Sequence, residues 1–134
     1  MKALLALVFA FLMPVAAIAA DNSQPAVDAA SAWLKLIDAG NYAQSWTDAS
    51  TLMKSRVTQS DWAKQLKPVR ESLGSVTSRD FVDAETATSL PGAPDGQYIV
   101  IRFHTRFANK ADATETITMM MDAGNWKAAG YFIR

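Results

Sequence analysis

A chain of 134 residues, half of them hydrophobic, is long enough for one domain with a buried core. Its 13 basic and 13 acidic residues give a formal net charge of zero and form no basic run, which argues against nucleic acid or an anionic membrane surface as the main partner. The chain has no cysteine, so it has neither a disulfide framework nor a cysteine nucleophile.

Residues 1–19 are typical of a secretory signal peptide. A positively charged start precedes an apolar run over residues 3–12, and Ala17 and Ala19 are the small residues that come before a cleavage site. We expect cleavage after Ala19, with cleavage after Ala20 as the second choice.

The apolar run is shorter than the roughly 20 residues that a membrane-spanning helix needs, so we expect no stable membrane insertion after cleavage. The protein is then periplasmic or secreted. Residues 20–25 are expected to form a linker, and residues 26–134 a single domain.

Two helices are expected at the start of this domain. The first covers residues 25–39, because proline suits a first helical turn and Gly40 can take the positive φ that ends a helix. The second is expected over residues 41–53, where Asn41 and Gln44 form a capping-box pattern.

A third helix is expected to begin at a cap formed by Thr58 or Ser60 and to continue up to Gly74. Pro68 lies inside it and removes one backbone hydrogen bond. We therefore expect a kink or a break near residues 65–67.

Four strands are expected in the second half, at residues 76–90, 97–107, 113–121 and 126–134, separated by short turns. These features predict an α+β fold with three N-terminal helices packed on one face of a four-stranded antiparallel meander sheet. The order of elements is similar to that of cystatin-like and nuclear-transport-factor-like architectures, which host many unrelated functions.

A polar face is predicted on the sheet, opposite the apolar residues of the strand at residues 97–107. One register of the first hairpin pairs Glu85 with Arg102 and Asp83 with His104, and a slip of two residues pairs Glu85 with His104 and Asp83 with Arg106. In either register these five residues share the outer side of the sheet. They form either an ordinary solvated surface or a contact surface for a homodimer or another partner.

A pocket between helices and sheet is the second candidate site, with Tyr42, Glu115 and Tyr131 as its lining. The strand alternation turns Glu115 toward the core, where a carboxylate needs a hydrogen-bond donor. A water-filled cavity there would indicate function, whereas a donor that only satisfies the carboxylate would be structural. Acid–base chemistry could also draw on Asp83, Glu85 and His104, if they approach Tyr131 on the sheet.

No catalytic residue, metal site or cofactor is predicted. His104 is the only histidine, and its strand neighbours Arg102 and Arg106 are cationic, which disfavours a metal ion. The serines lack a nucleophile-elbow motif, and the Pro91-Gly92 and Asp95-Gly96 pairs are typical of turns rather than of a phosphate-binding loop.

Three functions remain as hypotheses. The first is a non-catalytic binding or protein-interaction module of the bacterial envelope, with an unknown protein partner or small ligand. The alternative is a small acid–base pocket enzyme with a nuclear-transport-factor-like fold. A cystatin-type protease inhibitor is third, and no inhibitory loop motif supports it.

Motifs spread over residues 26–134 resemble a bacterial family of small exported proteins, catalogued as domain of unknown function 4019. The resemblance implies a protein class and export, and it brings no assigned catalytic residue. Its motifs are Trp33-Leu34, Gly40-Asn41-Tyr42, Ser45-Trp46, Trp62, Leu73-Gly74, Ser78-Arg79, Leu90-Pro91-Gly92-Ala93-Pro94-Asp95-Gly96, Glu115-Thr116 and Gly130-Tyr131.

Overall fold

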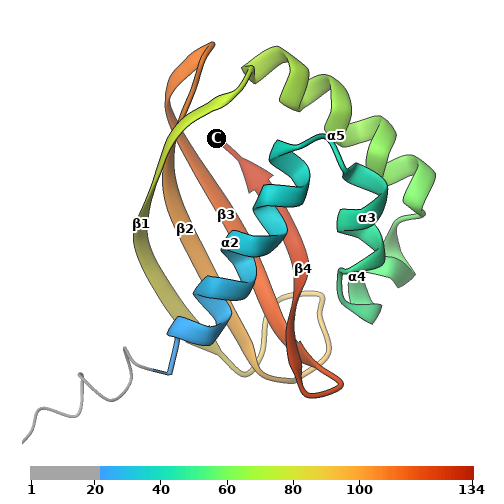
Figure 1. Cartoon of the computed structure of the whole chain (residues 1–134). Coiled ribbons are helices and arrows are strands. Elements are labelled where there is room, and N and C mark those ends of the chain that lie inside the picture. The colour runs from blue at the N-terminus through green and yellow to red at the C-terminus, as the bar shows by residue number, and fades with distance from the viewer. Residues whose placement is uncertain (1–21) are drawn as a thin grey trace, which may run out of the picture.

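The computed structural model describes residues 22–134, so the predicted signal peptide at residues 1–19 lies outside the described residues. Within the described part the strands form one antiparallel sheet in the order β1-β2-β3-β4, which confirms the α+β class and the four-stranded meander. None of the described helices is long and apolar enough to cross a membrane. The elements are α2 (Gln24–Asp38), α3 (Tyr42–Thr47), α4 (Thr51–Arg56), α5 (Gln59–Leu73), β1 (Val76–Ala87), β2 (Tyr98–Phe107), β3 (Lys110–Asp122) and β4 (Asn125–Ile133) (Figure 1).

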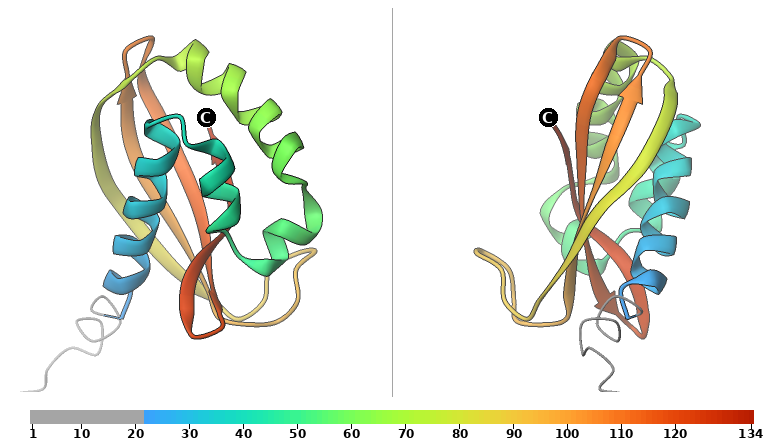
Figure 2. Two further views of the ribbon diagram at one scale, coloured as in Figure 1. Left: turned by 45° about the vertical axis from the view of Figure 1, so that its right-hand side comes forward. Right: turned by 90° about the vertical axis from the view of Figure 1, so that its left-hand side faces the viewer.

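Helix α2 packs on the sheet, and the two share one hydrophobic core. It has a proline in its first turn and is followed by Gly40 at a φ of 79°, as its sequence predicts. Figure 2 shows α2 lying against one face of the sheet. The buried side chains of α2 and of the strands form a single cluster, whose central members are Ala30, Trp33, Leu34, Ile37, Ile99, Ile101, Ile117 and Met119.

The single helix predicted over residues 41–53 is wrong, because the chain forms two short helices there, α3 and α4. The Ser50 amide donates a hydrogen bond to the Ala128 carbonyl of β4 at 2.8 Å, so it is not available to continue α3. The Ser50 hydroxyl then caps α4 by accepting from the Met53 amide at 3.1 Å, whereas the Asn41 side chain makes no capping bond. The described chain therefore has four helices rather than three.

Helix α5 begins after Thr58, whose hydroxyl accepts from the Asp61 amide as predicted. The predicted break before Pro68 is wrong, since the helix is continuous through it. The carbonyl that loses its donor belongs to Lys64, an exposed residue, where water can replace the missing hydrogen bond. The helix buries Leu66 and Arg70 and leaves Val69 45% exposed, so its inner side combines apolar surface with one buried charge.

Both predicted registers of the first hairpin are wrong. Asp83 pairs with Arg102, and His104 pairs with Asp80. The first shift arises at the connecting loop, where the Gly96 amide donates to the Thr88 carbonyl and the loop is longer than expected. A bulge between Phe81 and Asp83 then shifts the pairing a second time. The predicted faces survive, because the first shift is by an even number of residues and side chains alternate with a period of two.

Candidate functional site

The side of the sheet opposite the buried side chains, here called the outer face, carries the first candidate site. Exposed and partly exposed side chains alternate along β2 and β3 with the buried ones. Residues that pair across the strands share this face, so each row of the ladder contributes one side chain from each strand. The outer face comprises Asp80, Asp83 and Glu85 of β1, Val100, Arg102, His104 and Arg106 of β2, Thr114, Thr116 and Thr118 of β3, and Phe132 and Arg134 at the end of β4.

One ion pair organises the middle of the outer face. Arg102 binds both carboxylate oxygens of Asp83, with Nε 2.8 Å from Oδ1 and Nη2 on Oδ2. The hydrogen bond from Arg102 lowers the pKa of Asp83, and Asp83 in turn raises the pKa of Arg102. The two side chains are 50% and 42% exposed, so the pair orients charges on the surface more than it stabilises the fold.

A groove of about 420 Å³ crosses the outer face. It has carboxylates at its β1 end and a guanidinium at its β4 end, with hydroxyl groups between them. Phe132 is 49% exposed, and the Arg134 guanidinium lies 5.4 Å from the centre of its ring. The groove is lined by two residues from each of β1, β2 and β3, by Phe132 of β4 and by Arg134, which directly follows β4. These residues are Asp83, Glu85, Val100, Arg102, Thr114, Thr116, Phe132 and Arg134.

His104 and Arg106 also lie on the outer face, but not in the predicted ion pairs. His104 Nε2 is 2.9 Å from Asp112 Oδ1, and the Asp112 side chain is 94% exposed. Arg106 is exposed and lies opposite Ser78 in the ladder. The five residues of the predicted polar face thus share one surface, although only Asp83 and Arg102 bind each other.

Glu115 lies on the other side of the sheet and is completely buried. Its carboxylate accepts hydrogen bonds from Arg79 Nε at 2.7 Å, from the Thr105 hydroxyl and from the Tyr131 hydroxyl. A buried carboxylate needs such donors to replace the water that it has lost. The prediction that Glu115 points inward is confirmed, and each of its oxygens has at least one donor within the protein.

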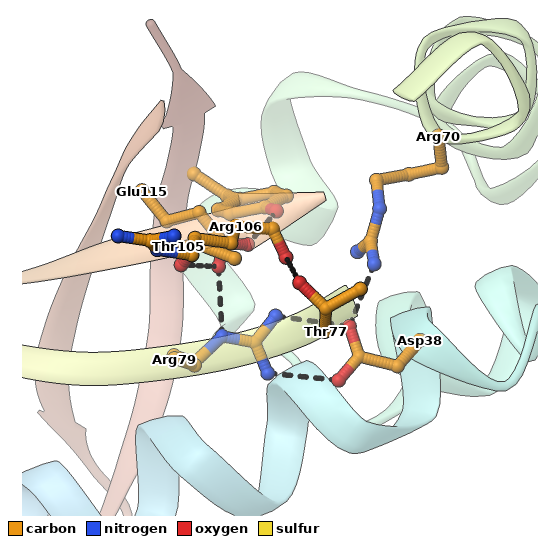
Figure 3. Close-up of polar contacts among 8 residues, drawn as sticks. Asp38, Arg70, Thr77, Arg79, Thr105, Arg106 and Glu115 are labelled. Carbon is orange, nitrogen blue, oxygen red and sulfur yellow. Dashed lines mark hydrogen bonds and ion pairs between the residues drawn. The ribbon is translucent and has the colours of Figure 1, made fainter. Parts of the chain in front are cut away.

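Arg79 continues this network toward the helices. Its Nη1 and Nη2 lie 2.8 and 2.9 Å from the two oxygens of Asp38, at the end of α2, and Figure 3 shows its guanidinium between Asp38 and Glu115. Arg70 of α5 donates to Asp38 at 2.6 Å and stacks over the Phe107 ring at 5.1 Å. Two guanidinium groups therefore face two carboxylates, which joins α2 and α5 to the sheet.

The buried network shifts the pKa of its members in the direction of mutual stabilisation. Burial raises the pKa of Asp38, but hydrogen bonds from Arg79 and Arg70 outweigh burial and leave it below its ordinary value. Burial lowers the pKa of Arg79, and its bonds to Asp38 and Glu115 raise it further than burial lowers it. Burial, followed by the charge of Glu115, raises the pKa of Tyr131 far above its usual range, so its hydroxyl stays protonated.

The three residues of the predicted pocket do not line one cavity together. Tyr42 lines a crevice of about 240 Å³ with Asp38 and Arg70 at the ends of α2 and α5. Tyr131 borders a different groove, beside Trp62. Glu115 is enclosed by its donors, and Tyr131 lies on the opposite side of the sheet from the acidic residues and histidine of the outer face.

Tyr131 is the one partner of Glu115 that the sequence analysis named; Arg79, Thr105 and Asp38 were not predicted as site residues. Arg79 is one of several charged residues in a polar strand, and its family motif carries no assigned role, while Asp38 is the last residue of α2. No local spacing links Arg79, Asp38 or Thr105 to Glu115. Among residues 22–134 there is also no group of three or more histidine, cysteine, aspartate and glutamate side chains that could hold a metal ion.

Comparison with known proteins gives a family without an assigned activity. No curated protein matches the chain. A family model described as a protein of unknown function, DUF4019, matches residues 29–131, which include nearly all of the helices and strands described above. The chain therefore belongs to the DUF4019 family.

Proposed function

We propose that this protein is a non-catalytic binding module of the bacterial envelope, exported by its predicted signal peptide, and that it contacts its partner through the outer face. The observation that carries the proposal is the difference between the two polar clusters. Every oxygen of Glu115 and Asp38 is occupied by a donor within the protein. The polar groups of the outer face are exposed or half-buried, and several of them line an open groove.

The composition of the outer face fits an interaction surface. Aromatic and arginine side chains are enriched in protein interfaces, and the outer face combines Phe132 with Arg102, Arg106 and Arg134. The threonine hydroxyls of β3 add donors and acceptors at regular spacing. Charges arranged in this way give orientation and specificity to an encounter.

An architecture of the cystatin-like or nuclear-transport-factor-like kind is part of the same proposal, with the helices on one face of the sheet and the outer face free. The acid–base enzyme has less support. A general acid or base must reach its substrate, and Glu115 is buried against three donors of the protein itself.

The test is capture from an envelope extract with two matched double variants. Arg106→Glu/Phe132→Ser alters the outer face and leaves the Asp83–Arg102 pair intact. Lys67→Glu/Val69→Ser makes the matching changes, a cation to glutamate and an exposed hydrophobic residue to serine, on α5. We expect the wild type and the α5 variant to retain the same partner, and the outer-face variant to lose it.

Retention of the partner by the outer-face variant would contradict the proposal, because the contact would then lie elsewhere. Turnover of a small molecule by the purified protein, lost in Glu115→Gln, would favour the enzyme instead. Circular dichroism melting of each variant is the folding control, since all four positions are exposed.

A further inference from the structure

The outer face has an uneven distribution of charge across its strands. Three carboxylates, Asp80, Asp83 and Glu85, belong to the edge strand β1, and a fourth, Asp112 of β3, bonds His104. At the opposite edge, Arg134 directly follows β4 and still exchanges backbone hydrogen bonds with Thr114. One edge of this surface is therefore acidic and the other edge carries a cation.

The strands between these edges also differ from each other. The outer side of β2 carries Arg102, His104 and Arg106, while β3 places the uncharged Thr116 and Thr114 opposite Arg102 and His104. In the ladder, one row of side chains runs Asp80, His104, Thr114 and Arg134, and the next runs Asp83, Arg102, Thr116 and Phe132.

We infer that the partner bound at the outer face is a second copy of this chain, related by a two-fold axis that runs parallel to the strands between β2 and β3. This inference rests on the proposed function and names its partner. Rotation about such an axis places β1 of one copy over β4 of the other, and β2 over β3. Asp80 then faces Arg134 of the second copy, and Arg102 and His104 of β2 face its Thr116 and Thr114.

The alternative two-fold axis in the plane of the sheet, perpendicular to the strands, is disfavoured by the same charges. It would place β1 over β1 and bring three carboxylates of one copy against three of the other. Like charges across an interface are unfavourable, so the charge distribution selects one orientation of the axis. In the selected arrangement, Phe132 faces the Asp83–Arg102 pair of the second copy, where the guanidinium can stack on the ring.

The size of the face predicts a weak dimer. Ten residues of β2 extend ~33 Å, and three interstrand spacings give a width of ~14 Å, so the flat area is ~460 Å² per copy. Stable interfaces bury about 800 Å² per partner. Association is therefore expected to be reversible and to require high protein concentration.

The test exchanges charge between the two edges. The purified protein is followed by sedimentation velocity from about 10 µM to about 1 mM, the range in which a weak dimer is populated. Arg134→Asp makes both edges acidic, and Asp80→Arg makes both edges basic at the contact row. Each variant alone should remain monomeric, and an equimolar mixture should form a heterodimer, because acidic edges then face basic edges at both contacts.

Lys67→Asp and Glu71→Arg are the matched controls. They introduce the same charge changes on α5, where the side chains are 64% and 65% exposed, and should dimerise like the wild type. Loss of dimer in both edge variants with its recovery in the mixture would support the inference. The inference would be overturned if either edge variant alone dimerised as well as the wild type. It would also be overturned if the mixture of the two edge variants stayed monomeric.

A wild type that is monomeric throughout this range would also overturn the inference. The proposed function would survive that result if envelope capture still depended on Arg106 and Phe132, since the partner would then be a different protein. Failure of both experiments would reject the outer face as a contact surface altogether.

Discussion

Replacing Glu115 by leucine should destabilise the domain by about 3–5 kcal/mol, the usual effect of removing one partner from a buried ion pair. The substitution leaves Arg79 Nε and the hydroxyls of Thr105 and Tyr131 without an acceptor. An unsatisfied buried donor costs about 1–3 kcal/mol, and more when it is charged. The summed cost of three unsatisfied donors can exceed the expected loss of stability, because the buried apolar leucine side chain offsets part of it.

Glu115→Gln should have a smaller effect, about 1.5–3 kcal/mol, the range found for hydrogen bonds to charged groups. The amide oxygen still accepts from Arg79, and the Tyr131 hydroxyl can accept from the new amide group. The negative charge and the acceptor of the Tyr131 O–H are lost, but no charged donor is left without an acceptor. The prediction therefore includes the order of the two effects: Glu115→Leu should lose more stability than Glu115→Gln.

Urea unfolding, followed by tryptophan fluorescence, measures both changes. The slope of the free energy against urea should stay constant, because the surface exposed on unfolding is nearly unchanged. Glu71→Leu is the control, since Glu71 is 65% exposed and its only ion pair within the described residues, to Lys67, is 3.9 Å long. If Glu115→Leu lost less than about 1 kcal/mol, or no more than Glu71→Leu, the network would not be holding the fold and the reasoning would be refuted.

Three further predictions concern packing, pH and export. Trp62→Ala should reduce stability by about 3 kcal/mol in urea, because the ring packs 6.0 Å from Trp33 and its Nε1 donates to the Ser45 hydroxyl at 2.9 Å; a change below about 1 kcal/mol would show that the ring is dispensable. The pKa of Asp38 is lowered in the folded protein, so its contribution to the free energy of unfolding is present at neutral pH and is lost as the pH falls through the folded pKa. Asp38→Asn should therefore be less stable than the wild type at pH 7 and equal to it in acid. A stability difference that persists below the folded pKa would contradict this. Intact-mass measurement of the exported protein should find a chain that begins at Ala20 or Asp21, and a membrane-bound form that retains the apolar run would contradict the predicted cleavage.

The inward direction of Glu115 could be predicted from the sequence because strand alternation is a local property. A residue's face depends only on its distance from a neighbour of known face, and Ile117 and Met119 identify the core side of β3. The same rule placed Arg102, His104 and Arg106 together on the outer face before their partners were known. Family membership was also predictable, since its motifs are short and spread along the whole domain.

The ion-pair partners that connect Glu115 to the helices, Arg79 and Asp38, could not be predicted in this way. Arg79 is 36 positions from Glu115 and 41 from Asp38, and each of them alone looks like an ordinary polar residue. They meet only because α2 ends beside β1 when the helix packs on the sheet. Packing determines that meeting, and no local spacing encodes it.

The sequence by itself therefore determined the order of helices and strands, the two faces of the sheet and the burial of Glu115, because these follow from the period of side chains along a few residues. Tertiary structure decided the register of the first hairpin, the break at Ser50 and the pairing of Asp38 with Arg79. The last two depend on contacts between distant segments, such as the bond from the Ser50 amide to the Ala128 carbonyl, and the register depends on a bulge and on where the hairpin ladder ends. Such contacts exist only after the chain has folded, since their free energy comes from groups that the sequence keeps far apart.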